Sequence, residues 1–292
     1  MKASRRGVFG LVLAATLSAC GQAGPMVAVR GNGLTSGNFE AKAGPKGRKL
    51  DYGWERYKTV FAPKAKPRRM PRQGLLPTRV DLREHDGPVY DQGDLGACTA
   101  FAMGKGMREH MQRRDDERIA PLSALFLYYE ERARQGTVKK DSGSTITEGM
   151  TVLKAVGCAT DETWPYDVPK FKVKPTKPAY ASASEYRIRE ATQLAELDDV
   201  RATLARGKTV AFGFLVYESF GKVGKDGVMK MPEKGDKVMG GHAVLAVGYD
   251  DQQRHLIVRN SWGKGWADGG YFYMPYDFAK DHERADDFWA AN

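Results

Sequence analysis

The chain has 292 residues, a formal net charge of +10 and three cysteines. The charge is uneven, because residues 21–80 hold 13 Lys and Arg against 3 Asp and Glu, whereas residues 81–292 hold 30 against 33. The basic character therefore belongs to the N-terminal part, which excludes a uniformly basic body, and no nucleic-acid partner is expected.

Residues 1–20 predict an export signal. Three basic residues, an apolar run over residues 8–17 and the sequence Leu17-Ser18-Ala19-Cys20 follow one another. The apolar run is shorter than the roughly 20 residues that a membrane-spanning helix needs. The segment resembles a bacterial lipoprotein signal, in which Cys20 is lipidated and becomes the mature N-terminus. An ordinary secretory peptide is the alternative, and the choice between the Sec and twin-arginine routes stays open.

Residues 21–75 are rich in Gly, Lys, Arg and Pro and lack a helical apolar stripe. This composition predicts a flexible basic tether with anchoring aromatics at Tyr52, Trp54 and Phe61. A basic arm can bind nucleic acid or anionic envelope polymers, and for an exported protein we favour the envelope surface or a plain spacer. The body, residues 76–292, is long enough for one compact unit or two lobes around a cleft.

The stretch Tyr90–Ala102 is a polar, glycine-rich loop that leads into an apolar run with helical spacing. Cys98 stands at the junction, so the spacing predicts a helix with its first turn at the thiol. A helix N-terminus carries unpaired N–H groups and a partial positive charge, which favour thiolate over thiol. We therefore expect a lowered pKa and a high nucleophilicity for Cys98.

The patterns after this stretch place helices before strands. Helical patterns cover Pro121–Glu130, Thr145–Val156 and Leu194–Arg206, the first of them with its proline at the start. Strand patterns cover Val210–Val216, Ala243–Tyr249, His255–Val258 and Tyr271–Met274. Early helices and late strands predict an α+β fold.

Two of the predicted strands carry candidate partners for the cysteine. His242 stands at the head of one strand, and Asn260 follows the next and precedes Trp262. A nucleophilic cysteine needs a base and a group that orients this base. A Cys followed roughly 130–150 residues later by His and then Asn is the order and spacing of papain-type enzymes.

On these residues the chain resembles the papain-like cysteine peptidases, in particular their bacterial members. The resemblance implies that Cys98 is the nucleophile and that His242 is the base. It further implies that Asn260 orients the imidazole and that Trp262 shields the hydrogen bond between them from water. Gln92 matches the glutamine whose side-chain amide helps to form the oxyanion hole.

The resemblance covers roughly residues 76–273 and implies a fold and a substrate-binding set. The implied fold is α+β, with a helical lobe and a β-barrel-like lobe that face each other across the active-site cleft. Ser142 and Gly143 would line the non-primed side, where glycine lets the enzyme backbone pair with an extended peptide. Ala243 would floor the pocket for the second residue before the scissile bond, and Trp262 belongs to the same set. Ordinary loop and strand packing is the alternative for these segments.

Two positions depart from the family pattern. Thr99 stands where many members place a tryptophan directly after the nucleophile, so a reshaped primed side of the cleft is expected. Leu95 stands where exported relatives carry a bonding cysteine, so the body is expected to lack a disulfide. Cys158 is then a small buried thiol, with a structural disulfide between Cys98 and Cys158 as the alternative.

The sequence thus predicts a cysteine endopeptidase that works through an acyl-enzyme and is lipid-anchored to the bacterial cell envelope, facing periplasm or exterior. We expect a peptide or protein substrate, a monomer, no cofactor and no metal, since the histidines are scattered in type and spacing. The alternatives are an inactive peptide-binding homologue, a transpeptidase or amidase acting on cell-wall peptides, and a surface adhesin that works through the basic arm.

Overall fold

The computed structural model describes residues 53, 67, 69, 74–115 and 118–292, all of which lie in one compact unit, Phe39–Asn292. The predicted export signal, Cys20 and most of the predicted tether lie outside the described residues. Among the described residues, no helix is both long enough and apolar enough to cross a membrane.

A continuous helical run begins at the predicted nucleophile. α1 (Cys98–Ala100) leads into a π-helical segment (Phe101–Arg108) and then into α2 (Glu109–Arg114). The helix start predicted at Cys98 is confirmed. The thiol therefore sits in the first turn, where backbone N–H groups have no helical partner.

α3 (Ala124–Gln135) starts later than the sequence predicts. The hydroxyl oxygen of Ser123 accepts a hydrogen bond from the N–H of Phe126 at 3.0 Å and caps the helix. This side-chain cap satisfies an N–H group that the helix itself cannot, which is why the helix begins here. Pro121 lies outside the first turn, and the helix start predicted at this proline is wrong.

α4 (Ile146–Ala155) agrees with the predicted helix to within a residue at each end. The Thr145 hydroxyl oxygen caps it by accepting the N–H of Glu148 at 3.2 Å. Such a cap stabilises a helix by about 1 kcal/mol.

Two further helices follow along the chain. α5 (Lys177–Ala183) is not predicted by the sequence analysis. α6 (Leu197–Leu204) is shorter than predicted at both ends. At its start Glu196 and Asp199 form a capping box, in which each side chain accepts the backbone N–H of the other residue, and this fixes the first turn of the helix.

A seven-stranded sheet with the order β2-β7-β3-β4-β5-β6, and with β1 paired to β4, forms the other half of the described fold. Each of these neighbouring strands pairs antiparallel. The strands are β1 (Arg79–Asp81), β2 (Ala191–Gln193), β3 (Val210–Tyr217), β4 (Val238–Asp250), β5 (His255–Arg259), β6 (Tyr271–Pro275) and β7 (Ala285–Ala291), with α7 (Tyr276–Ala279) after β6. The four predicted strands are present. Because β4 and β5 are neighbours, residues on β4 and just after β5 can meet.

β4 extends beyond its predicted N-terminal end. The strand pairs with β3 as far back as Val238, so Gly240 and Gly241 belong to the ladder. His242 pairs with Phe214 inside the strand, and its predicted place at the head of the strand is wrong. The ladder with β3 fixes the backbone of His242 within the strand.

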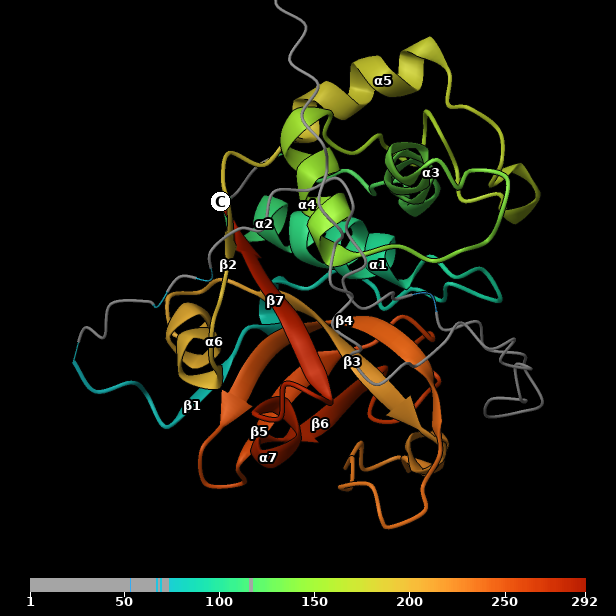
Figure 1. Ribbon diagram of the computed structural model, residues 1–292. Coiled ribbons are helices and arrows are strands. Elements are labelled where there is room, and N and C mark those ends of the chain that lie inside the picture. Colours follow the sequence, from blue (N-terminus) through green and yellow to red (C-terminus); the bar gives the residue numbers. More distant parts are fainter. Residues whose placement is uncertain (1–52, 54–66, 68, 70–73, 116–117) are drawn as a thin grey trace, which may run out of the picture. The chain divides into compact units, whose positions relative to one another are not determined.

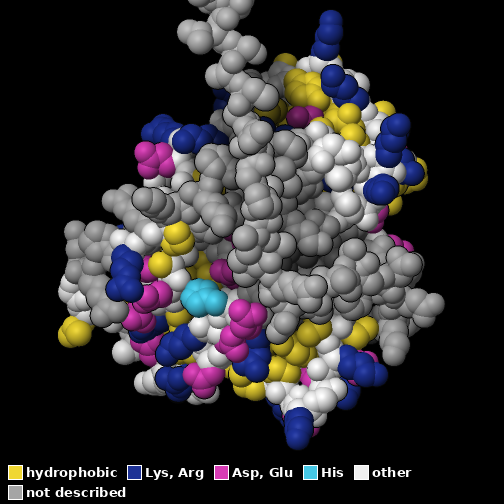
Figure 2. All heavy atoms as spheres, viewed as in Figure 1, with side chains coloured by type: hydrophobic (Ala, Val, Ile, Leu, Met, Phe, Trp, Pro, Cys, Tyr) yellow, Lys and Arg dark blue, Asp and Glu magenta, His cyan; other side chains and the backbone are white. Residues whose placement is uncertain are grey.

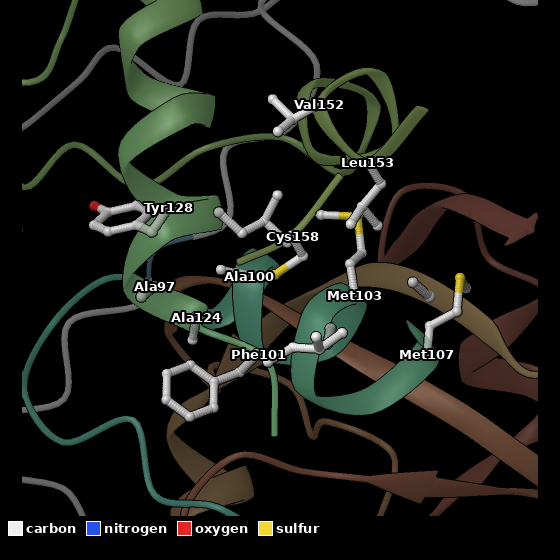
Figure 3. Close-up of a cluster of buried hydrophobic side chains, with 14 of the residues drawn as sticks. Ala97, Ala100, Phe101, Met103, Met107, Ala124, Tyr128, Val152, Leu153 and Cys158 are labelled. Carbon is white, nitrogen blue, oxygen red and sulfur yellow. The ribbon is translucent and has the colours of Figure 1, made fainter. Parts of the chain in front are cut away.

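Two hydrophobic cores correspond to the two lobes. In the first, the run from α1 packs against α3 and α4, and Figure 3 shows Ala100, Met103 and Tyr128 in this cluster. The second lies within the sheet lobe and includes Phe212 and Phe214 together with residues of α6 and α7. Figure 1 shows helices α1 to α5 gathered on one side and the sheet on the other. The predicted α+β fold with a helical lobe and a sheet lobe is confirmed.

Cys158 lies in the helical core beside α1 and α3 (Figure 3). Its thiol is fully buried and donates to the carbonyl of Ser123 at 3.4 Å. Cys98 and Cys158 are both free thiols, so the alternative of a disulfide between them is excluded.

The cap of α4 can be tested by substitution. Thr145→Ala removes the hydroxyl that accepts the N–H of Glu148, and we expect it to lower the free energy of unfolding by about 1 kcal/mol. Thr145→Ser is the matched control, since it keeps the oxygen and loses only a methyl group. Chemical denaturation of both variants checks this, and equal stabilities would contradict the assigned cap.

Candidate active site

Cys98 and the residue after His242 meet where α1 packs on β4. The backbone N–H of Ala243 points at the Cys98 sulfur across 3.4 Å, although the two residues are 145 positions apart in the chain. Both residues are buried, Cys98 completely. The structure therefore brings the predicted nucleophile beside the strand that carries the predicted base.

His242 is held by two neighbours from the turn after β5. Its Nε2 lies 2.8 Å from the Oδ1 of Asn260, which also accepts the N–H of Ser261 at 2.8 Å. The indole of Trp262 stacks on the imidazole with 5.0 Å between ring centroids and 24° between ring planes. Since Nε2 is engaged with Asn260, Nδ1 is the ring nitrogen that can exchange a proton with Cys98.

Gln92 lies on the loop before α1 and is buried. Its Nε2 donates to the carbonyl of Leu95 at 3.0 Å, and its Oε1 accepts the hydroxyl of Ser261 at 2.5 Å. These two bonds fix which end of the amide is nitrogen. An amide nitrogen carries two hydrogens, so one remains after Leu95 for an oxyanion.

Ser261 is a site residue that the sequence analysis missed. It ties the turn after β5 to the loop before α1 twice, through its hydroxyl to Gln92 and through its carbonyl, which accepts the Gln92 N–H at 2.9 Å. Tyr166 adds a third bond, from its hydroxyl to the Gln92 carbonyl at 2.7 Å. The only sequence signal for Ser261 is its place between Asn260 and Trp262.

The thiol and the imidazole are both neutral in this arrangement. Burial raises the pKa of Cys98 to about 12, and burial lowers the pKa of His242 to about 4. The expectation of a lowered Cys98 pKa is therefore wrong for this state. The helix N-terminus and the N–H of Ala243 favour thiolate, but the loss of water around a fully buried sulfur outweighs them.

Gly53 covers the thiol. Its backbone forms a parallel bridge with Gly241, its carbonyl accepts the N–H of Ser144 at 2.8 Å, and it hydrogen-bonds the Cys98 sulfur. A Cβ built on Gly53 would lie 1.9 Å from the carbonyl oxygen of Gly96. The fit thus requires glycine. Nothing in the composition of residues 21–75 indicates that one of them lies in the site.

Three of the four predicted substrate-binding residues lie next to Gly53, Cys98 or His242, and the fourth, Ser142, bonds elsewhere. Gly143 lies against Gly53, whose carbonyl oxygen would be 2.0 Å from a Cβ at this position, and Gly143 has a φ of 71°. Ala243 and Trp262 flank Cys98 and His242, respectively. The hydroxyl of Ser142 turns instead to Thr137 at 2.9 Å.

Asp141 links the loop before Cys98 to the loop that contains Gly143. Its carboxylate accepts the N–H of Gly96 at 3.1 and 3.2 Å and a short hydrogen bond from the Tyr128 hydroxyl. The Tyr128 oxygen in turn accepts the N–H of Gly143 at 3.0 Å. No local pattern predicts these hydrogen bonds, because only the tertiary fold brings Asp141 and Tyr128 to Gly96.

Within the described ranges, no group of three or more His, Cys, Asp or Glu side chains could hold a metal ion. The arrangement around Cys98 instead offers a thiol, an oriented imidazole and amide donors. This is the equipment for nucleophilic attack on a carbonyl.

Comparison with known proteins gives the family. The family model for papain family cysteine proteases matches residues 76–287. A peptidase C1-like protein of Acanthamoeba polyphaga mimivirus is 37% identical over 210 residues, covering 68% of each chain. Cysteine proteinase 3 of Entamoeba histolytica is 25% identical over 69% of this chain and 63% of its own, so the match spans less than two thirds of that relative.

Among solved structures, xylellain, a cysteine protease from Xylella fastidiosa, is 35% identical with a TM-score of 0.76. The match covers 84% of this chain and 97% of xylellain. The chain belongs to the papain family of cysteine proteases.

The cover over Cys98 gives a testable expectation. In Gly53→Ala the new Cβ would clash with the Gly96 carbonyl, and overpacking of this kind costs about 1–3 kcal/mol. We expect residue 53 to leave its place over the thiol and Cys98 to react with iodoacetamide about fivefold faster or more at pH 7. Gly221→Ala, in open space, is the control. Unchanged labelling of Cys98 in Gly53→Ala would show that Gly53 does not protect the thiol.

Proposed function

We propose that this chain is an exported, lipid-anchored cysteine endopeptidase whose nucleophile is Cys98 and whose base is His242. The observation that carries the proposal is the hydrogen bond of 2.8 Å between His242 Nε2 and Asn260 Oδ1, stacked under Trp262 beside the Cys98 sulfur. This bond leaves Nδ1 of the imidazole as the proton acceptor for the thiol.

The proposed reaction begins when Gly53 leaves the site and water or substrate replaces it. The Cys98 proton then passes to His242, because an ion pair costs less once the two groups are no longer fully buried. The thiolate attacks the peptide carbonyl, the imidazolium gives its proton to the leaving amine, and the acyl-enzyme is hydrolysed by a water that His242 activates.

The proposed oxyanion hole consists of the Cys98 backbone N–H and the Gln92 side-chain amide. Ser261 supports this role, since its hydroxyl donates to the oxygen of the Gln92 amide and leaves the nitrogen as the end that can donate to an oxyanion. Each such donor contributes about 3 kcal/mol to stabilising the tetrahedral intermediate in comparable enzymes.

The position of Gly53 supports a binding mode for the peptide substrate. Its carbonyl takes the N–H of Ser144 and its backbone bridges to Gly241, as an extended peptide would. We infer that the substrate backbone follows this path. It would then pass close to the backbone of Gly143, which has no side chain in the way, and Ala243 would lie beside the nucleophile. The Ser142 hydroxyl donates to Thr137, so this side chain is not directed at the path that we infer for the substrate.

The catalytic assignment predicts a graded loss of activity. Cys98→Ser and His242→Ala should nearly abolish peptide hydrolysis, and Asn260→Ala should reduce it by less, since it only orients the base. The measurement is kcat/KM on a fluorogenic peptide. Equal activity of all three variants and the wild type would sink the assignment, and turnover of cell-wall peptides alone would favour the transpeptidase or amidase.

The oxyanion role predicts that Gln92→Ala lowers kcat by about a hundredfold, with little change in KM. Ser261→Ala should lower kcat in the same direction by less, because the amide stays but loses its orienting partner. Gln193→Ala, on β2, is the control. A rise in KM at constant kcat would contradict the oxyanion assignment.

Lipid anchoring rests on the sequence Leu17-Ser18-Ala19-Cys20 after an apolar run too short to span a membrane. We expect Cys20→Ala to move the protein from the membrane fraction to the soluble fraction of a bacterial host, and to abolish incorporation of labelled palmitate. Wild-type protein without label would favour an ordinary secretory signal.

A peptide or protein substrate and a monomeric state complete the proposal, with no nucleic-acid partner. Residues 81–292 carry 30 basic against 33 acidic residues. At the lower left of the face in Figure 2, Lys and Arg side chains are interspersed with Asp and Glu. A mixed surface of this kind is a poor footprint for a phosphate backbone.

A further inference from the structure

A buried carboxyl group lies directly under the first turn of α1. Glu131, on α3, is fully buried, and its Oε2 accepts a hydrogen bond of 2.6 Å from the hydroxyl of Thr99. Thr99 is also fully buried and is the residue after Cys98. Figure 3 shows Ala100 of α1 and Ala124 of α3 in the same buried cluster.

Glu131 has no ion-pair partner among the described residues, and the opposite charge that acts on it is that of Arg132, which lowers its pKa against the larger effect of burial. None of the ion pairs between described residues includes Glu131, and its Oε1 has no hydrogen-bond partner in the described part of the chain. On α4, Glu148 is committed to Arg134 at 2.8 Å. On α3 itself, Arg132 donates to the carbonyls of Tyr128, Val138, Lys140 and Phe171.

Further charged groups lie against α3. The Asp141 carboxylate accepts the Tyr128 hydroxyl, Lys105 lies against Asp161 and Glu109, and the Arg108 guanidinium lies over the Tyr186 ring. Cys98 is a further titratable neighbour, and its thiolate feels the charge of Glu131. The carboxyl group and the nucleophile are thus coupled through the buried start of α1.

We propose that Glu131 is a positioning residue for Cys98, which holds the first turn of α1 through Thr99 and governs by its own protonation how readily the thiol ionises. The inference rests on the proposed function of Cys98 as nucleophile. Thr99, where many family members carry tryptophan, is then the link between the carboxyl group and the nucleophile.

The sign of the coupling follows from the charges. Burial raises the pKa of Glu131 to about 8, so the group is a neutral acid at pH 6.5. When it gives up its proton to water at higher pH, its negative charge raises the pKa of Cys98 and disfavours the thiolate. The wild-type thiol should therefore lose reactivity above pH 8, relative to a variant that cannot ionise.

The titration of Glu131 can be measured through stability in the full-length chain. The pKa is raised from 4.5 to about 8, so between these values the folded state holds a proton that the unfolded state has lost. The free energy of unfolding should then fall as pH rises through this window. In Glu131→Gln this fall should be smaller, whereas exposed Glu185→Gln should match the wild type. Identical pH slopes in wild type and Glu131→Gln would overturn the proposal.

The coupling to Cys98 is tested by the rate of alkylation with iodoacetamide, located by mass spectrometry in full-length protein. The ratio of the Glu131→Gln rate to the wild-type rate should be near one at pH 6.5. It should rise to about fivefold above pH 9, since a nearby like charge shifts a pKa by about one unit or more. Thr99→Ser should keep the wild-type profile, and Thr99→Val should move the step to higher pH because the carboxylate loses its donor.

The outcomes separate the two proposals. A wild type that is labelled at Cys98, with the same profile in Glu131→Gln, overturns the role of Glu131 and leaves the nucleophile in place. A Gly53→Ala chain, in which the thiol is uncovered, that is not labelled at Cys98 at any pH contradicts the proposed function and, with it, this inference.

Discussion

A thiol and an imidazole that are both buried from water can hold one pair of opposite charges or none, and this constraint governs the site. With Gly53 seated over it, Cys98 has no exposed surface, and the pKa values of Cys98 and His242 are displaced in the directions that keep both neutral. A neutral thiol is a poor nucleophile. The same burial that assembles the site therefore also holds it unreactive, and uncovering Cys98 is the change that permits the ion pair.

The geometry around this pair depends on how the two lobes pack. Gly106, on the π-helical segment after α1, lies where a Cβ would come within 3.0 Å of the Leu245 side chain on β4. This close approach brings Cys98 within hydrogen-bond distance of the Ala243 N–H. Ser261 and Gln92 join the lobes a second time. Because the nucleophile and the base come from different lobes, these contacts fix their relative position in place of any disulfide among the described residues.

The order and spacing of a few residues predicted the elements of the site. Cys98 begins α1, His242 lies within β4 and Asn260 directly follows β5, three elements that hydrophobic periodicity reveals, and Gln92 lies on the loop that leads to Cys98. The α+β fold followed from the same patterns. The start of α3 was mispredicted because the cap at Ser123, not a proline, decides it.

The features that the sequence could not predict are contacts between residues that lie far apart in the chain. The bonds of Asp141 to Gly96 and of Thr99 to Glu131 span 45 and 32 residues, and no local pattern marks them. The neutral state of Cys98 also depends on tertiary burial, which the position of a helix N-terminus does not reveal. Position 53 requires a glycine because the backbones of Gly96 and Gly143 come close to it on both sides, and these contacts form only in the folded chain.

The most direct test of the account is covalent labelling of the full-length protein with an epoxysuccinyl peptide inhibitor, followed by mass mapping of the adduct. The account predicts a single adduct on Cys98 that forms faster in Gly53→Ala, where the thiol is uncovered, and that disappears in His242→Ala, since the thiolate needs the imidazole to take its proton. An adduct on Cys158, or labelling of Cys98 that is undiminished in His242→Ala, would contradict it.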